Sequence, residues 1–253
     1  MRKSLAVFLT AFAVAAPAQS EPITIFAASS MKTALDQVVA ESGLDAIAAY
    51  GGSATIARQL AQGAEADIVI LAHNDWMDWL EGQGALQSGS RCDLLGNELV
   101  LAGPANSIDL DLNTADDLLD ALDGGRLAVG QLLSVPAGQY TAAFLEQRGW
   151  LTQLRPHLAE TSNVRLALAL VARGQAPLGF VYASDVAAQP DVRALFKPDP
   201  ALYPSIRYPL ALSADAQPGA AEMLQILTSA GPVFAQNGFH PLPSDDPTAC
   251  STS

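Results

Sequence analysis

Short apolar runs rich in β-branched residues alternate with helical patterns along almost the whole chain. The first run covers residues 23–27, and the positions Met31, Ala34, Leu35 and Val38 after it repeat at the spacing of one helix face. Further strand-like runs occupy residues 66–72, 99–102, 127–130, 178–182 and 206–212. Helical patterns occupy residues 56–61, 75–82, 115–123, 139–147, 164–173, 220–229 and 232–236. This alternation predicts an α/β fold in which helices cover both faces of parallel sheets.

The N-terminus has the three parts of an export signal. Arg2 and Lys3 precede an apolar segment at residues 4–15, and Ala16-Pro17-Ala18 has the pattern of a cleavage site. The alternative is a retained membrane anchor, but the apolar segment is too short to cross a bilayer comfortably. We therefore expect residues 1–18 to be a signal peptide and the mature protein to be periplasmic.

The charge balance excludes one broad class of partner. The chain carries 13 basic and 26 acidic residues, a formal charge of −13, and loss of Arg2 and Lys3 would change it to −15. Nucleic-acid binding requires clusters of Lys and Arg, and no basic run is present. We therefore expect no nucleic-acid partner.

The two cysteines, Cys92 and Cys250, lie far apart and outside any CxxC motif. In an oxidising compartment they could form a disulfide that ties the C-terminal tail to the body of the protein. The alternative is two free thiols, or bonds to other molecules. A zinc or redox site is not indicated.

Serines and glycines stand where strands are followed by helices. Ser30 and Ser53 are placed to cap two helices, and residues 135–138 and 162–164 precede two more. A helix N-terminus has unpaired N–H groups and a partial positive charge, so it binds anions without Lys or Arg. Several such ends facing one cleft would form a neutral pocket for a small oxyanion. The alternative is that each serine is an ordinary cap worth roughly 1 kcal/mol.

An ordered set of motifs covers nearly all of the chain after residue 25. These motifs are residues 26–30 (FAASS), 53–60 (SATIARQL), 66–68, 76–78, 94–100, 125–130, 135–140 (VPAGQY), 164–171 and 176–185 (APLGFVYASD). Together they resemble the periplasmic molybdate-binding proteins of ABC transporters. The chain departs from that pattern at Gly51 and Gly52, where the family often has serines, and in the tail beyond Phe239.

The resemblance implies a type II periplasmic-binding-protein fold. Such a fold has two lobes, each a mixed sheet flanked by helices, with the ligand cleft between them. Two crossover strands join the lobes, and residues 99–102 and 208–212 are the candidates. The predicted division is lobe 1 at residues 22–100 plus 209–243, lobe 2 at residues 101–208, and a C-terminal tail at residues 244–253.

The resemblance also implies the ligand contacts. Ser30 and Ser53 correspond to the serines that bind the oxyanion, and Tyr182 to a tyrosine that donates its hydroxyl. Ala137 and Val164 correspond to residues that donate backbone N–H groups from the second lobe. Molybdenum would enter only as molybdate held by these five residues, without a cofactor.

The expected function is capture of molybdate, or of tungstate, which has almost the same radius, by a monomer that delivers it to an ABC permease. The alternatives are a receptor for sulfate or another small anion, and an enzyme on the same fold. No G-x-S-x-G or H-E-x-x-H motif is present, and the scattered histidines favour surface or packing roles: His73, His157 and His240. The tryptophans could form a platform for an organic ligand, but packing is the favoured interpretation for them: Trp76, Trp79 and Trp150.

Overall fold

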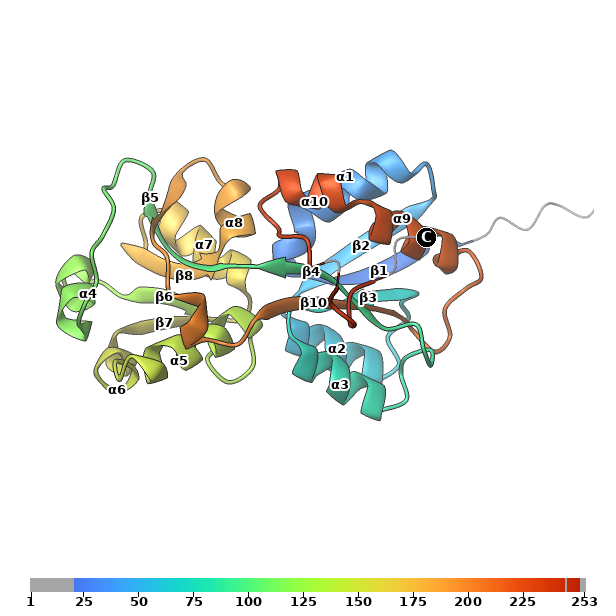
Figure 1. Ribbon diagram of the computed structural model, residues 1–253, viewed down its shortest axis with the longest axis horizontal. Coiled ribbons are helices and arrows are strands. Elements are labelled where there is room, and N and C mark those ends of the chain that lie inside the picture. Colours follow the sequence, from blue (N-terminus) through green and yellow to red (C-terminus); the bar gives the residue numbers. More distant parts are fainter. Residues whose placement is uncertain (1–20, 244, 251–253) are drawn as a thin grey trace, which may run out of the picture.

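The computed structural model describes residues 21–243 and 245–250, so the predicted signal peptide lies outside the described residues. The described residues form two five-stranded sheets, each flanked by helices, that lie side by side as two lobes (Figure 1). None of the helices in this part of the chain is long and apolar enough to cross a membrane.

The first lobe is built on a sheet with the strand order β2-β1-β3-β10-β4. Its strands are β1 (Ile23–Ala28), β2 (Ala46–Gly51), β3 (Ile68–Ile70), β4 (Cys92–Asn97) and β10 (Ile206–Leu212). Its helices are α1 (Lys32–Ser42), α2 (Ser53–Ala61), α3 (Asn74–Gly82), α9 (Ala220–Ser229) and α10 (Gly231–Gln236). Helices α2 and α3 cover one face of the sheet, and α1, α9 and α10 cover the other (Figure 1).

The second lobe is built on a sheet with the strand order β7-β6-β8-β5-β9. Its strands are β5 (Leu99–Pro104), β6 (Leu127–Gly130), β7 (Leu158–Thr161), β8 (Leu178–Tyr182) and β9 (Val192–Phe196). Its helices are α4 (Ala115–Leu122), α5 (Pro136–Gln147), α6 (Leu151–Leu154), α7 (Val164–Ala172) and α8 (Ala183–Ala187). Short 3-10 turns occupy Arg155–His157 and Pro200–Leu202.

Both sheets are mixed. In the first, β1 runs parallel to β2 and β3, whereas β10 runs antiparallel to its neighbours. In the second, β6 runs parallel to β7 and β8, whereas β5 runs antiparallel to its neighbours. The prediction of parallel sheets from strand–helix alternation is therefore wrong. Each sheet also contains a strand next to a crossing between the lobes, and this strand runs antiparallel to its neighbours. The mixed sheets implied by the family resemblance are confirmed.

The chain passes between the two sheets twice. Only Glu98 separates β4 of the first sheet from β5 of the second, and the chain returns through the segment between β9 and β10. The carboxyl ends of β1, β2, β6, β7 and β8 meet where the lobes face each other. In open α/β sheets this is the edge at which ligands bind.

The C-terminal tail is attached to the edge of the first sheet. A disulfide joins Cys92 on β4 to Cys250, the pairing that the sequence left open. Beside it, Cys250 N–H donates to the carbonyl of Asp93 at 2.9 Å, and Asp93 N–H donates to the carbonyl of Thr248 at 2.8 Å. The tail thus pairs with β4 and covers backbone groups that an edge strand would otherwise expose.

Candidate functional site

A small cavity lies where the two lobes meet. Its volume is about 10 Å³, and it is lined by residues of both lobes, among them all five predicted ligand residues: Ser30, Ser53, Ala137, Val164 and Tyr182. Pockets for drug-sized ligands hold roughly 300–1,000 Å³, so this one suits a much smaller solute. None of the described residues that line it carries a charged side chain. A ligand here would be held by neutral groups.

Ser30 lies in a 3-10 turn (Ser29–Met31) that follows β1, and it is buried. The prediction that it caps the first helix is wrong, because Ala28 and Met31 occupy the cap positions and neither makes a side-chain cap bond. Its hydroxyl instead lies 2.8 Å from the hydroxyl of Tyr208, on β10. Ser30 is thus oriented by tertiary contacts and not by its own helix.

Ser53 is the first residue of α2, so the prediction that it is the N-cap is also wrong; Gly52 holds that position. Its hydroxyl oxygen accepts a hydrogen bond from the backbone N–H of Ala72 at 3.0 Å. That bond uses a lone pair of the oxygen and leaves the hydroxyl proton free. Among the described residues no acceptor takes this proton, so Ser53 can donate it to a ligand in the cavity.

Two helix N-termini of the second lobe face the same cavity. Ala137 is the second residue of α5, which begins at Pro136 and so earlier than the sequence predicted. Val164 is the first residue of α7, and the Asn163 side chain caps this helix by accepting from Leu166 N–H. The first backbone N–H groups of a helix have no partner within it. Ala137 and Val164 therefore offer donors with the helix dipole behind them.

Tyr182 ends β8 and is fully buried. Its hydroxyl has no hydrogen-bond partner among the described residues. Burial raises the pKa of this phenol well above its ordinary value, so it remains protonated at neutral pH. A buried hydroxyl without a partner is costly, and an acceptor in the cavity would satisfy it.

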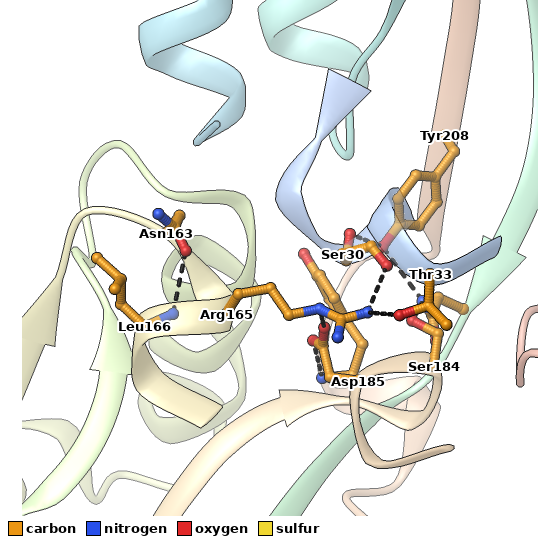
Figure 2. A network of polar contacts seen from close by, with 10 residues as sticks. Ser30, Thr33, Asn163, Arg165, Leu166, Ser184, Asp185 and Tyr208 are labelled. Atoms are coloured by element: carbon orange, nitrogen blue, oxygen red, sulfur yellow. Dashed lines mark hydrogen bonds and ion pairs between the residues drawn. The ribbon is translucent and has the colours of Figure 1, made fainter. Parts of the chain in front are cut away.

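Polar contacts hold the lobes together beside the cavity. Figure 2 shows Arg165 of α7 extending to the first lobe, where it donates to the carbonyl of Ser30 at 3.0 Å. The same guanidinium forms an ion pair of 2.8 Å with the buried carboxylate of Asp185 on α8. Burial raises the pKa of Asp185 to about 6, although Arg165 acts in the opposite direction. A second bond joins the lobes where the hydroxyl of Tyr140 donates to the carbonyl of Ala72 at 3.3 Å.

The backbone at Gly52 also shows how closely the lobes approach. A Cβ atom at this position would lie 2.5 Å from the carbonyl oxygen of Ser162, in the second lobe. Only a residue without a side chain fits this arrangement. Gly52, one of the two glycines at which the chain departs from the family pattern, thus lies at the contact between the lobes.

Other residues considered from the sequence lie away from the cavity. Neither the three histidines nor the three tryptophans line it. Trp150 packs edge-on against Phe144 in the second lobe, with ring centroids 5.9 Å apart. Within the described residues, no group of three or more His, Cys, Asp or Glu side chains could hold a metal ion. Sequence reasoning missed Arg165, Asp185 and Tyr208; the contacts of Arg165 and Tyr208 with Ser30 span 135 and 178 residues.

The chain matches known proteins over most of its length. Residues 23–240 match the model of the family described as bacterial extracellular solute-binding protein. The chain is 38% identical over 222 residues to the molybdate-binding protein ModA of Escherichia coli K12, which covers 83% of this chain and 86% of the relative. It is 36% identical to ModA of Haemophilus influenzae, over 74% of this chain and 78% of the relative.

Solved structures share the fold. The periplasmic molybdate-binding protein of Azotobacter vinelandii superposes with a TM-score of 0.73 at 21% identity, over 88% of this chain and 100% of that one. The sulfate-binding protein SubI of Mycobacterium tuberculosis superposes with a TM-score of 0.72 at 20% identity, over 90% of this chain and 88% of that one. Because the two scores are nearly equal, the shared fold does not distinguish a molybdate receptor from a sulfate receptor.

Proposed function

The chain belongs to the bacterial extracellular solute-binding proteins, and we propose that it captures molybdate in the cavity between its lobes and delivers it to an ABC importer. The observation that carries this proposal is a neutral cavity in which hydroxyl and backbone donors of both lobes converge. The sequence identity to ModA proteins supports molybdate as the ligand.

The proposed ligand contacts follow from the donors around the cavity. The hydroxyls of Ser30, Ser53 and Tyr182 and the backbone N–H groups of Ala137 and Val164 would surround the oxyanion. Molybdate near neutral pH is a fully deprotonated dianion, which accepts hydrogen bonds and donates none. Such a ligand needs no counter-charge when every oxygen finds a donor.

Selectivity would follow from protonation and size. Monohydrogen phosphate carries a proton that needs an acceptor, and leaving a buried polar group unpaired costs about 1–3 kcal/mol. Sulfate is deprotonated but smaller, so some of the donors would be too far from its oxygens. Tungstate, with almost the same radius as molybdate, would bind about as well. The main alternative, a sulfate receptor, is favoured only by the structural likeness to SubI.

Binding would be coupled to closure of the lobes. We place the division between them at residues 100 and 209, with the tail beginning at residue 244. Ser30 and Ser53 then belong to one lobe, and the other three donors to the second. The full set surrounds the ligand only when the lobes are closed, as in hinge-bending receptors.

We further propose that the protein acts as a periplasmic monomer, exported through residues 1–18, that docks on a membrane permease. It would carry no cofactor and catalyse no reaction. The formal charge of −15 without the signal does not oppose anion capture, because the overall field acts mainly on encounter rate, whereas affinity depends on local donors.

Calorimetric titration of the mature protein with molybdate, tungstate, sulfate and phosphate tests the proposal. We expect tight binding of the first two, weak binding of sulfate, and binding of phosphate so weak that only competition at high concentration detects it. Preferential binding of sulfate would favour the alternative, and binding of none of the four would overturn the ligand class.

A further inference from the structure

The hydroxyl of Tyr208 lies between the cavity residue Ser30 and the side chain of Asn97. It lies 2.8 Å from the Ser30 hydroxyl and 3.2 Å from the amide nitrogen of Asn97. Figure 2 shows Ser30 and Tyr208 side by side. All three residues are buried, and neither Tyr208 nor Asn97 lines the cavity. Tyr208 and Asn97 therefore do not touch a ligand in the cavity, and their hydrogen bonds reach it through Ser30.

Asn97 fixes the direction of this chain of hydrogen bonds. Its carbonyl oxygen accepts from Glu98 N–H at 2.9 Å, which turns the amide nitrogen toward Tyr208. The same nitrogen donates to the hydroxyl of Ser184 at 2.8 Å. An amide NH₂ group donates and does not accept. The Tyr208 oxygen must therefore accept a hydrogen bond from Asn97.

Tyr208 then has one proton to donate, and Ser30 is the partner within reach. Burial raises the pKa of this phenol, so it does not ionise near neutral pH. The pairing of β10 with β4 shifts register between Tyr208 and Pro209. Such irregularities re-aim side chains, and here the Tyr208 hydroxyl reaches the Ser30 hydroxyl. The Ser30 oxygen thus accepts from Tyr208, and its own proton is left for the cavity.

We propose that Asn97 and Tyr208 form a relay that fixes the Ser30 hydroxyl as a donor toward the cavity and so set the preference of the site for oxyanions that carry no proton. This inference rests on the proposed function, because it concerns the selectivity of the same cavity. The Ser53 hydroxyl is also left with its proton free for the cavity, because its oxygen accepts a hydrogen bond from a different donor, the backbone N–H of Ala72. In this relay Asn97 and Tyr208 are positioning residues that do not touch the ligand.

The relay predicts a change in selectivity when either residue is altered. Tyr208→Phe leaves the ring in place but frees the Ser30 hydroxyl to rotate, so that its oxygen can accept a hydrogen bond from a protonated ligand. Asn97→Asp goes further, because a carboxylate accepts from Tyr208, and Ser30 must then donate to Tyr208 and turn its lone pairs to the cavity. Both variants should favour anions that carry a proton.

Sulfate and monohydrogen phosphate make a matched pair of probes, because they are similar in size and equal in charge but differ by one proton. Competition titrations against molybdate in mildly alkaline buffer, where the phosphate dianion predominates, give their affinity ratio. The buried negative charge in Asn97→Asp would weaken the binding of both dianions equally and, by itself, leave this ratio unchanged. The ratio therefore reports on hydrogen-bond direction.

We expect the preference for sulfate over phosphate to fall roughly threefold to tenfold in Tyr208→Phe, the effect of about one hydrogen bond, and further in Asn97→Asp. The control is Tyr203→Phe, which removes a hydroxyl that accepts from Leu99 N–H outside the cavity and should leave the ratio unchanged. Thermal melts check that each variant is folded.

Two outcomes would overturn the relay. A folded Tyr208→Phe or Asn97→Asp variant with the parental ratio would show that Ser30 does not depend on them. An equal change in Tyr203→Phe would show that the effect is not specific to the relay. Failure of the parent protein to bind molybdate or sulfate would overturn the proposed function and the relay with it, a result distinct from normal binding with an unchanged ratio.

Discussion

The guanidinium of Arg165, in the second lobe, donates a hydrogen bond of 3.0 Å to the backbone carbonyl of Ser30, in the first. Ser30 also lines the cavity, where its hydroxyl is one of the proposed donors. A single residue therefore contacts the opposite lobe through its backbone and the site through its side chain. The buried carboxylate of Asp185, in the same lobe as Arg165, orients the guanidinium for this contact.

Removal of this contact should speed ligand release. The double variant Arg165→Met/Asp185→Asn deletes it without leaving a buried unpaired charge, which would itself be strongly destabilising. We expect the dissociation rate of molybdate, measured by stopped flow, to rise roughly threefold to tenfold, because one interlobe hydrogen bond is lost. Asp185→Asn alone keeps the donor of this bond but removes the carboxylate that orients it, so it should raise the rate less than the double variant does. An unchanged rate in the double variant would show that the contact does not hold the closed form.

Asp185 should make stability depend on pH in a defined direction. Burial raises its pKa from an ordinary value of 3.8 to about 6, so between these values the folded protein binds more protons than the unfolded chain. Its linked contribution to the free energy of unfolding is therefore fully present below the lower value and is lost as the pH rises through about 6. Urea unfolding at several pH values from 4 to 7 should show a flatter profile for Asp185→Asn than for the parent. Parallel profiles would contradict the assignment.

Ser53→Ala should affect both binding and stability. The substitution removes a donor from the cavity and leaves the backbone N–H of Ala72 without its partner. We expect the free energy of molybdate binding to weaken by roughly 1–3 kcal/mol and the midpoint of thermal unfolding to fall. Thr55→Ala, at an exposed position of the same helix, is the matched control and should leave calorimetric binding intact. Parental affinity in Ser53→Ala would remove this residue from the site.

The disulfide should stabilise the protein without contributing to binding. Cys92 and Cys250 are 158 residues apart in the sequence and lie outside the cavity. Replacing both with serine should lower the free energy of unfolding by roughly 2–4 kcal/mol, because the unfolded chain loses a constraint. Denaturant unfolding measures this loss, and molybdate titration of the folded variant should give the parental affinity. A large loss of affinity would mean that the tail acts on the site.

The sequence predicted the strands whose apolar character is strong and missed those defined by pairing. The runs that became β1, β6, β8 and β10 were predicted close to their observed bounds. Four strands were not predicted, because each is rich in alanine or contains polar residues: β2 (Ala46–Gly51), β4 (Cys92–Asn97), β7 (Leu158–Thr161) and β9 (Val192–Phe196). Their hydrogen bonds to a neighbouring strand, and not their composition, make them strands.

The same distinction holds for the candidate site. The five residues named from the resemblance do meet at one cavity, but the local prediction that Ser30 and Ser53 cap helices is wrong. The partner of the Ser30 hydroxyl, Tyr208, is 178 residues away, and no local pattern reveals such a pair. Local propensity indicates where a serine lies relative to a helix, whereas the direction of its proton depends on tertiary contacts.

A crystal structure of the mature protein grown with molybdate, with anomalous scattering recorded at the molybdenum edge, would test the central claim most directly. We predict one strong anomalous peak in the cavity between the lobes, with oxygens within hydrogen-bond distance of the hydroxyls and N–H groups of the five proposed residues: Ser30, Ser53, Ala137, Val164 and Tyr182. A peak elsewhere, or an oxyanion held by a charged side chain, would contradict a site built from neutral donors.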